Sequence, residues 1–290
     1  MIAACQLADI AEKAARGVRD MLLTAFDNPG KVEWKRNFHD PVTVHDRRAE
    51  HALRACLWEH APDSLILGEE EGQLIGRDAR PRTPTPDDII WLLDPIDGTA
   101  NFASGLDIWC VSIGAICGDE VIAGVIYQPT CDRLYRADNS GAYRNGVTIT
   151  ASQAPISDML ITTSFPSERL EDRVGAARGY DLLLTHAKSM RRIGSTALSL
   201  AYVAEGVCGG TFAMGTQPWD IGAGIALIQR AGGVFRGVDD ARRIHHRRPF
   251  AYASYLAGGT PQVCDLMFEA MCCAAAQPLQ TPYFAPEEDA

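Results

Sequence analysis

The chain has 290 residues, 47% of them hydrophobic, which is enough for one large domain or two smaller ones. Its 37 Asp and Glu residues outnumber its 27 Lys and Arg residues, and the formal net charge of −10 argues against nucleic acid or an anionic membrane as the main partner. The nine cysteines form no Cys-x-x-Cys pair, and no stretch is long and apolar enough to cross a bilayer. Because the N-terminal sequence carries charges throughout, we expect a cytoplasmic protein with reduced thiols, no signal peptide and no membrane partner.

The first half of the chain is predicted to mix helices with strands in hairpins, as in an α+β fold. Apolar residues at helical spacing indicate an amphipathic helix over residues 2–26, and a second helix follows Asp46. Short buried strands are predicted at 64–68 and 88–94, with a proline-rich surface loop over 77–88 between them. A hairpin of two buried strands and a set of short strands are then predicted at 109–117, 121–127 and 131–146.

The second half alternates strands with helices, which is typical of an α/β layer around a mostly parallel sheet. Strands are predicted at 158–164, 207–213 and 249–259, and helices at 195–206 and 220–233. The change in rhythm predicts a boundary near residue 155. We therefore expect an N-terminal α+β domain over 1–155 and a C-terminal α/β domain over 156–290.

Two aspartates follow a buried strand in "WLLDPIDGTANF", which spans residues 91–102. Asp-Pro and Asp-Gly are common turn formers, so a purely structural turn is one interpretation of this segment. Asp94 and Asp97, however, come just after five apolar residues, and ligands of α/β sheets bind at strand ends. A buried carboxylate without a partner is costly, so these acids need a compensating charge.

Glu69, after "LILG", and Asp220, after Trp219, share this position at the end of an element or the start of one. Binding of a hard divalent cation would explain why all four acids occupy such positions. Mg²⁺ prefers carboxylate oxygens and keeps waters for a substrate phosphate. The spacing of Asp94 and Asp97 suits paired metals ~3.5–4 Å apart, which stabilise the attacking and leaving oxygens of a phosphoryl displacement.

Gly98 and Thr99 come directly after these aspartates. A glycine lets a phosphate approach the backbone, and a helix that starts at this point would direct free N–H groups toward it. The Thr99 hydroxyl could hold a water. The local sequence therefore predicts phosphate chemistry at a magnesium site.

Three motifs carry a family resemblance. "WLLDPIDGTANF" matches W-x-x-D-P-x-D-G-T-x-N-F, and "GEE" at 68–70 and "WDIGAGIALIQRAGG" at 219–233 match two further signatures. Over roughly residues 5–275, the chain resembles the inositol monophosphatase family, within the Mg²⁺-dependent, lithium-sensitive sugar-phosphatase superfamily. The resemblance implies a sugar-phosphatase fold, which is a layered αβαβα sandwich, with two or three Mg²⁺ ions per active site and a homodimeric assembly.

The resemblance also implies roles for single residues. Glu69 would act in catalysis as well as in metal binding, and Asp94 would bridge two metals. Glu70 would lie next to the ligand Glu69 without binding the metal directly. The implied metal ligands are Glu69, Asp94, Asp97, Asp220 and the backbone carbonyl of Ile96.

In the same family an activated water attacks phosphorus in line, without a phosphoenzyme. "TVHD" is similar to the family's T-x-T-D segment, so Asp46 would lie behind Thr99, and the pair would orient the water. The backbone N–H groups of Gly98 and Thr99 would bind the phosphate.

Substrate contacts are implied for Asp97 and for Ser195 and Thr196, although the last two residues can simply cap the helix that follows. Ala213 stands where the animal inositol enzymes have a glutamate, whose charge-assisted hydrogen bond is worth on the order of 1.5–3 kcal/mol. Inositol 1-phosphate or a related polyol or sugar phosphate remains the leading substrate. The alternatives are histidinol phosphate, fructose 1,6-bisphosphate and 3'-phosphoadenosine 5'-phosphate, or a purely non-catalytic binding or regulatory role.

Overall fold

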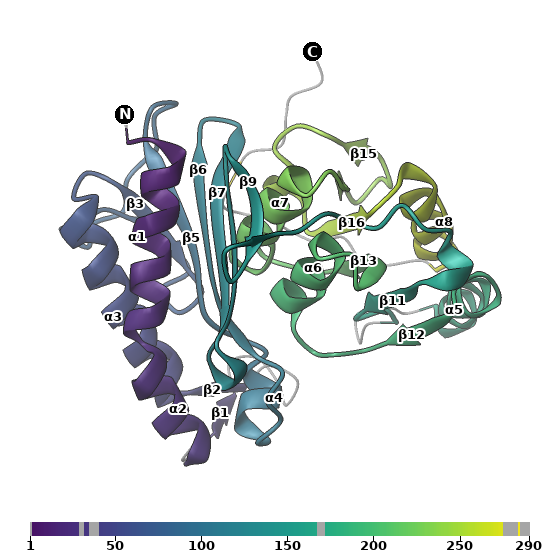
Figure 1. Ribbon diagram of the computed structural model, residues 1–290, viewed down its shortest axis with the longest axis horizontal. Helices are drawn as coiled ribbons and strands as arrows, with labels where there is room; N and C mark the ends of the chain where they lie inside the picture. The colour runs from purple at the N-terminus through teal and green to yellow at the C-terminus, as the bar shows by residue number, and fades with distance from the viewer. Residues whose placement is uncertain (1, 29–31, 35–40, 167–171, 275–283, 285–290) are drawn as a thin grey trace.

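The computed structural model describes residues 2–28, 32–34, 41–166, 172–274 and 284. Helices and sheets alternate in five layers (Figure 1), which confirms the predicted αβαβα sandwich. The outer helices of the first sheet are α1 (Ala4–Gly17), α2 (Arg19–Asp27) and α3 (Val44–His60). The central layer consists of α6 (Thr196–Ala204) and α7 (Pro218–Arg230), and the last layer consists of α5 (Arg173–His186) and α8 (Pro261–Cys272).

The first sheet has eight strands in the order β10-β9-β8-β7-β6-β5-β3-β4. Only β3 and β5 run parallel, and every other neighbouring pair is antiparallel, as predicted for an α+β half. The bounds are β3 (Leu65–Gly68), β4 (Leu74–Ile75), β5 (Ile89–Asp97), β6 (Cys110–Cys117), β7 (Glu120–Gln128), β8 (Arg133–Asp138), β9 (Gly141–Arg144) and β10 (Val147–Thr148). A separate antiparallel pair is formed by β1 (Val32–Trp34) and β2 (Pro41–Thr43).

The second sheet has six strands in the order β12-β11-β13-β16-β14-β15. Its bounds are β11 (Leu160–Thr163), β12 (Ser189–Arg191), β13 (Cys208–Met214), β14 (Val234–Val238), β15 (Ile244–His245) and β16 (Ser254–Gly258). The prediction of a mostly parallel sheet is wrong, because β11 is parallel to β12 and β13 whereas the other three pairs are antiparallel. A helix crossover keeps β13 and β14 in the same direction, but β16 returns without a helix and inserts between them antiparallel.

Several element bounds differ from the sequence prediction. The helix predicted over 2–26 is two helices, because the helix is interrupted at Val18, which has φ −96° and ψ 0°. The strand predicted from residue 249 begins only at Ser254, since a 3₁₀ turn occupies Pro249–Ala251. The short helix α4 (Thr99–Ala103) begins at the predicted position after Gly98.

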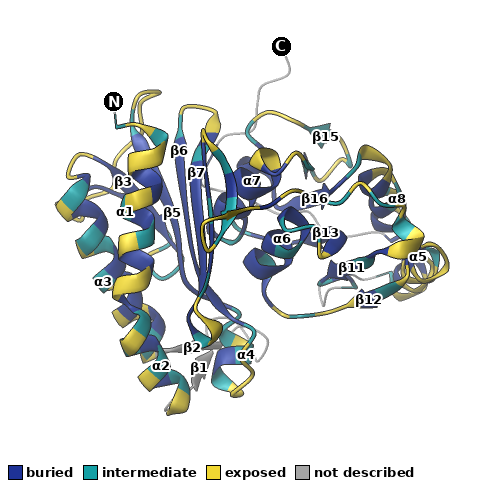
Figure 2. Ribbon diagram, viewed as in Figure 1, coloured by how far each residue is buried: buried dark blue, intermediate teal, exposed yellow. Residues whose placement is uncertain are grey.

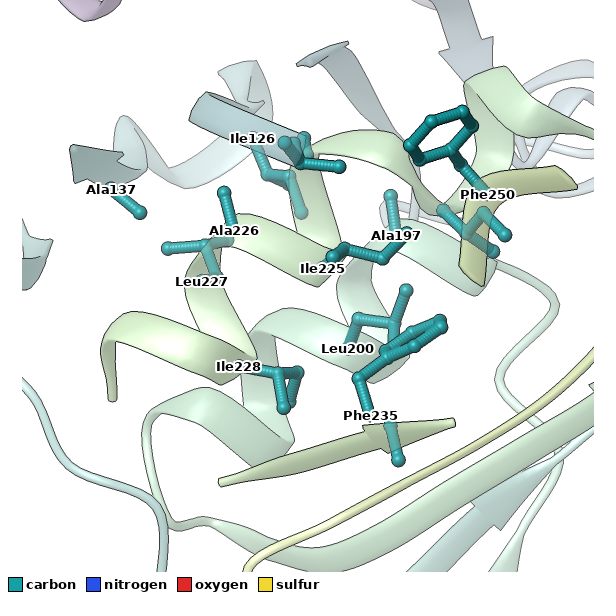
Figure 3. Close-up of a cluster of buried hydrophobic side chains, with 14 of the residues drawn as sticks. Ile126, Ala137, Ala197, Leu200, Ile225, Ala226, Leu227, Ile228, Phe235 and Phe250 are labelled. Atoms are coloured by element: carbon teal, nitrogen blue, oxygen red, sulfur yellow. The ribbon is translucent and has the colours of Figure 1, made fainter. Parts of the chain in front are cut away.

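Helix α7 is buried on nearly every side because it lies between the two sheets (Figure 2). Ile225 and Ile228 lie on the side of α7 that faces Leu200 of α6 and Phe235 of β14, whereas Leu227 lies on the opposite side, toward Ala137 of β8 (Figure 3). A helix that is apolar all round is expected at such a position. In the described part of the chain, none of the helices has the length and hydropathy that a membrane span requires.

Glycines bring α7 unusually close to the first sheet. A Cβ atom at Gly114 of β6 would lie 2.8 Å from Ala223 N, and one at Gly124 of β7 would lie 2.6 Å from Ala223 O. Within α7, a Cβ at Gly222 would meet the side chain of Leu92 at 2.6 Å. This close approach sets the distance between α7 and the first sheet. It thereby also sets the position of the acidic residue in the first turn of α7.

We expect Gly124→Ala to lower the free energy of unfolding by about 1–3 kcal/mol, since the new methyl group meets backbone rather than a flexible side chain. Gly17→Ala is the matched control, because no atom lies within 4 Å of the added Cβ, and it should be neutral or slightly stabilising. Urea unfolding followed by circular dichroism measures both. Equal midpoints for Gly124→Ala and wild type would contradict the close packing of α7.

Candidate active site

A β-bulge separates Asp94 and Asp97 at the end of β5. Asp94 pairs with Ser112 of β6 whereas Asp97 pairs with Cys110, so β5 holds an extra residue between its two acids. Bulges of this kind redirect side chains, and they are common beside functional sites. Ile96 N donates a hydrogen bond of 2.9 Å to Asp94 Oδ1, which holds the bulge in place. Both carboxylates are buried, and Asp94 is only 2% exposed.

Two further acids come to this edge from other elements. Glu69 follows β3, the parallel neighbour of β5, and its backbone N–H donates a hydrogen bond of 3.1 Å to Leu93 O. Asp220 lies in the first turn of α7, where its Oδ2 accepts a hydrogen bond of 2.8 Å from Gln217 N. The carboxyl ends of parallel strands and the N-terminus of a central helix therefore meet at one edge of the sheet.

The acids at this edge repel one another. Burial raises the pKa of Asp94 well above its usual value, and the charges of Glu69, Asp97 and Asp220 raise it further. Carboxylates held this close in a buried place resist ionisation until a cation or hydrogen-bond donors compensate their charge.

Donors from α6 compensate Asp97 in this structure. Ser195 Oγ and Ala197 N donate to Asp97 Oδ2, the latter at 2.9 Å, and Thr196 N donates to Oδ1 at 3.1 Å. Burial raises the pKa of Asp97 to about 6, although these hydrogen bonds favour the charged form. A carboxylate offers about four lone-pair sites, so Oδ1 keeps capacity for a further ligand.

Thr99 and Asp46 meet beside the bulge. Thr99 Oγ1 lies 3.4 Å from Asp46 Oδ1 and 3.1 Å from Ile96 O, and its single proton can serve either acceptor. Asp46 is buried in the first turn of α3. Gly98 has φ +101°, a left-handed conformation that glycine adopts without strain, and α4 begins at the next residue. The first turn of α4 therefore presents backbone N–H groups at the carboxylate edge.

A cavity of about 170 Å³ opens beside the contact between Asp97 and α6. Ser195, Thr196 and Ala213 contribute to its lining, and Arg192 is the only charged residue among those that line it in the described part of the chain. Most other lining residues carry hydroxyl groups, namely Thr163, Ser164, Ser199, Thr211 and Tyr255. A wall of hydroxyl groups suits a polyhydroxylated ligand.

Sequence reasoning missed Glu50, a buried carboxylate on α3 that lies one turn after Asp46. Glu50 Oε2 accepts a hydrogen bond of 2.8 Å from Glu70 N, and burial raises the pKa of Glu50 to about 7. The i, i+4 spacing of the two acids was the available signal, because it places both on one face of the helix. The Glu70 carboxylate itself lies 3.8 Å from Arg47 Nε.

The structure thus brings the predicted acids to one edge of the sheet, but their side chains do not form a complete set of metal ligands. Among the described residues, no three His, Cys, Asp or Glu side chains form a ready metal-binding group. Asp97 and Asp220 instead accept hydrogen bonds from the protein. The donor set still fits Mg²⁺, because it consists of carboxylates and a backbone carbonyl, and because the buried acids need a positive charge.

Both the sequence and the fold are similar to those of known proteins. A family model described as the inositol monophosphatase family matches residues 4–269. The chain is 31% identical over 266 residues to Nus factor SuhB of Escherichia coli K12, which covers 91% of this chain and 94% of that protein. It is 32% identical over 240 residues to a fructose-1,6-bisphosphatase/inositol-1-monophosphatase of Aquifex aeolicus, covering 80% and 84%. The crystal structure of extragenic suppressor protein suhB from Bartonella henselae has a TM-score of 0.78 and 27% identity, covering 90% of this chain and 97% of that one.

Without metal, we expect the free energy of unfolding to fall as the pH rises from 5 to 8. Asp97, Glu50 and Asp94 have folded-state pKa values above their usual ones, so the folded state binds more protons than the unfolded state across this interval. The loss should reach a few kcal/mol, since one pKa unit corresponds to about 1.4 kcal/mol.

Urea unfolding in EDTA at several pH values measures this dependence. The Asp94→Asn variant is the control, and its curve should be flatter than that of wild type because one buried ionisation is removed. A wild-type protein that gains stability over the same interval would contradict the assignment of these pKa shifts.

Proposed function

The chain belongs to the inositol monophosphatase family, and we propose that it is a Mg²⁺-dependent phosphomonoesterase that hydrolyses inositol 1-phosphate or a related polyol or sugar phosphate. One observation carries the proposal. Asp94 is buried at the end of β5, and three neighbouring acids raise its pKa instead of compensating its charge. A phosphatase site that binds a cation gives a reason for an arrangement that otherwise costs stability.

The cation would be held by Glu69, Asp94, Asp97, Asp220 and the carbonyl of Ile96, with two or three Mg²⁺ ions in each site. When bound, Mg²⁺ supplies Lewis-acid activation of water and neutralises charge on the phosphate. Asp97 Oδ1 has capacity for this role while it accepts from Thr196 N, and Ile96 O has a second lone pair besides the one facing Thr99.

The chain's own residues then position the reacting groups. Asp46 accepts a hydrogen bond from the Thr99 hydroxyl, so that Thr99 Oγ1 can itself accept a hydrogen bond from the attacking water and hold it in line. The N–H groups at the start of α4, after Gly98, bind the phosphate oxygens. Glu69 acts beside them in catalysis, at the edge that β3 and β5 share.

The cavity beside Asp97 would receive the alcohol part of the substrate. Ser195 and Thr196 would contact the ring hydroxyls, and the support for this role is that both residues line the cavity beside Asp97, to which Ser195 Oγ donates a hydrogen bond. Ala213 offers no carboxylate there, which weakens the case for inositol 1-phosphate as the exclusive substrate. Arg192 and the Aquifex relative's name both favour fructose 1,6-bisphosphate as the first alternative, ahead of histidinol phosphate and 3'-phosphoadenosine 5'-phosphate.

A second candidate function is a binding or regulatory role, alone or beside catalysis. Its support is the name of the Escherichia coli relative, Nus factor SuhB, which is not the name of an enzyme. The net charge of −10 favours a protein partner over nucleic acid for such a role. We further propose a cytoplasmic homodimer with two domains that meet near residue 155, and inhibition by lithium, as the family resemblance implies.

We expect Asp94→Asn to lower phosphate release by more than about 100-fold, because the loss of a ligand should exceed the 10- to 100-fold cost of losing a group that only supports one. Asp63→Asn, which changes an exposed aspartate, is the matched control and should match wild type. Phosphate release from the four named substrates, with Mg²⁺ and with EDTA, measures the effect.

Circular dichroism confirms that both variants are folded before their activities are compared. Activity that persists in Asp94→Asn, or in wild type with EDTA, would contradict the magnesium site. No phosphate release from any of the substrates with Mg²⁺ present would instead favour the binding role.

A further inference from the structure

A buried glutamate lies behind the loop that carries Glu69. Glu50 is 2% exposed and occupies the same face of α3 as Asp46, one turn further along the helix. Asp46 reaches Thr99, whereas Glu50 reaches the backbone of the Gly68–Glu70 loop. A buried carboxylate on a helix is costly, so its presence needs a reason beyond packing.

Glu50 contacts the loop on both sides of Glu69. Its Oε2 accepts a hydrogen bond of 2.8 Å from Glu70 N. On the other side, a Cβ atom at Gly68 would lie only 2.6 Å from Glu50 Oε1, so the carboxylate packs directly against the Gly68 backbone. Glu69 N itself is bound to Leu93 O of β5 at 3.1 Å. The backbone of Glu69 is therefore fixed from three directions.

Arg54 also lies near the Glu50 carboxylate, but it faces the oxygen that does not bind Glu70 N. Its Nη1 lies 3.6 Å from Glu50 Oε1 and donates a hydrogen bond of 2.8 Å to Glu71 Oε1. Among the described residues, Glu50 Oε1 accepts no hydrogen bond, so the ion pair with Arg54 only partly compensates its charge. The ion pair with Arg54 does not by itself explain why Glu50 is buried, because the same pair could form at the protein surface without the cost of removing two charges from water.

We propose that Glu50 is a positioning residue that directs the Glu69 carboxylate toward the cation, which makes α3 the element that aligns two parts of the site at once. This inference rests on the proposed magnesium site. Helix α3 would align Thr99 through Asp46 and the Glu69 loop through Glu50, four residues apart. Residues that support a metal ligand in this way typically contribute 10- to 100-fold to metal affinity or activity.

Calorimetric titration of the metal-free full-length protein with Mg²⁺ tests the proposal without relying on activity. We expect Glu50→Ala to weaken Mg²⁺ binding by about 10- to 100-fold. Glu50→Gln should stay within about threefold of wild type, because its amide oxygen can still accept from Glu70 N. In steady-state assays, Glu50→Ala should raise the Mg²⁺ concentration needed for half-maximal rate more than it lowers kcat at saturating Mg²⁺.

Glu71→Gln is the matched control, because it removes the other carboxylate bound to Arg54 and leaves the Glu70 N–H contact intact. It should bind Mg²⁺ like wild type. If Glu50→Ala fails to fold in EDTA, Glu50→Asp takes its place, since the shorter side chain keeps the charge but not the reach to Glu70 N.

The outcomes separate the inference from the function on which it rests. Wild-type affinity in Glu50→Ala, or in Glu50→Asp where that variant takes its place, would overturn the positioning role and leave the phosphatase proposal standing. Equal weakening in Glu50→Ala and Glu71→Gln would also overturn it, because the effect would then come from Arg54. A wild-type protein that binds no Mg²⁺ would overturn both.

Discussion

The contact between Asp97 and the start of α6 is the interaction on which the site depends most. It joins β5 of the first sheet to the start of α6 in the central layer, about 100 positions apart in the chain, through hydrogen bonds from Ser195, Thr196 and Ala197 to one buried carboxylate. A helix N-terminus favours negative charge, so the acid is partly compensated where it lies. The same contact places the hydroxyl-lined cavity next to the acids of β5. If it were lost, the acidic edge of the first sheet and the hydroxyl-lined cavity would no longer be adjacent.

The charge of Asp94 is compensated less completely than that of Asp97. Asp94 receives one backbone hydrogen bond and is repelled by the acids around it, so its pKa rises. Carboxyl groups whose pKa values are raised by burial and by neighbouring charges are common at functional sites. The rigid elements around it keep the acids in place at a cost to stability. The glycines of the first sheet beneath α7 set the distance between this helix and the sheet, and Glu50 of α3 accepts a hydrogen bond from the loop after β3.

Local sequence patterns predicted the parts of the site that lie on short segments. Asp94 and Asp97 stand at the end of a run of apolar residues, and the glycine that follows has the positive φ that its position requires. The same reasoning singled out Glu69, Asp220 and Thr99, and the family resemblance added Asp46, Ser195 and Thr196. Glu50 was missed because a polar residue within an amphipathic helix is normally assigned to the solvent face, and only the fold shows that this face of α3 meets the loop after β3.

The sequence predicted the fold class, but it did not predict the strand order of the second sheet or every helix. Nothing local to β16 indicates that it inserts between β13 and β14, because strand direction depends on how the chain returns. Helix α5 was missed because Gly175 and Gly179 weaken a helical pattern. Their role is tertiary, since a Cβ at Gly179 would lie 2.3 Å from Ala270 O of α8. Glycines that disfavour a helix locally thus permit the close packing of α5 against α8.

The most direct test of the account is the position of a bound cation. Crystals of the full-length protein grown with Mn²⁺ in place of Mg²⁺ would locate the ion by anomalous scattering. We expect peaks within coordination distance of the Asp94 and Glu69 carboxylates, and one that Asp94 shares with Asp97 or Asp220. A protein that hydrolyses phosphate monoesters in the same Mn²⁺ solution but shows no peak at this edge would contradict the claim that a cation compensates these buried acids.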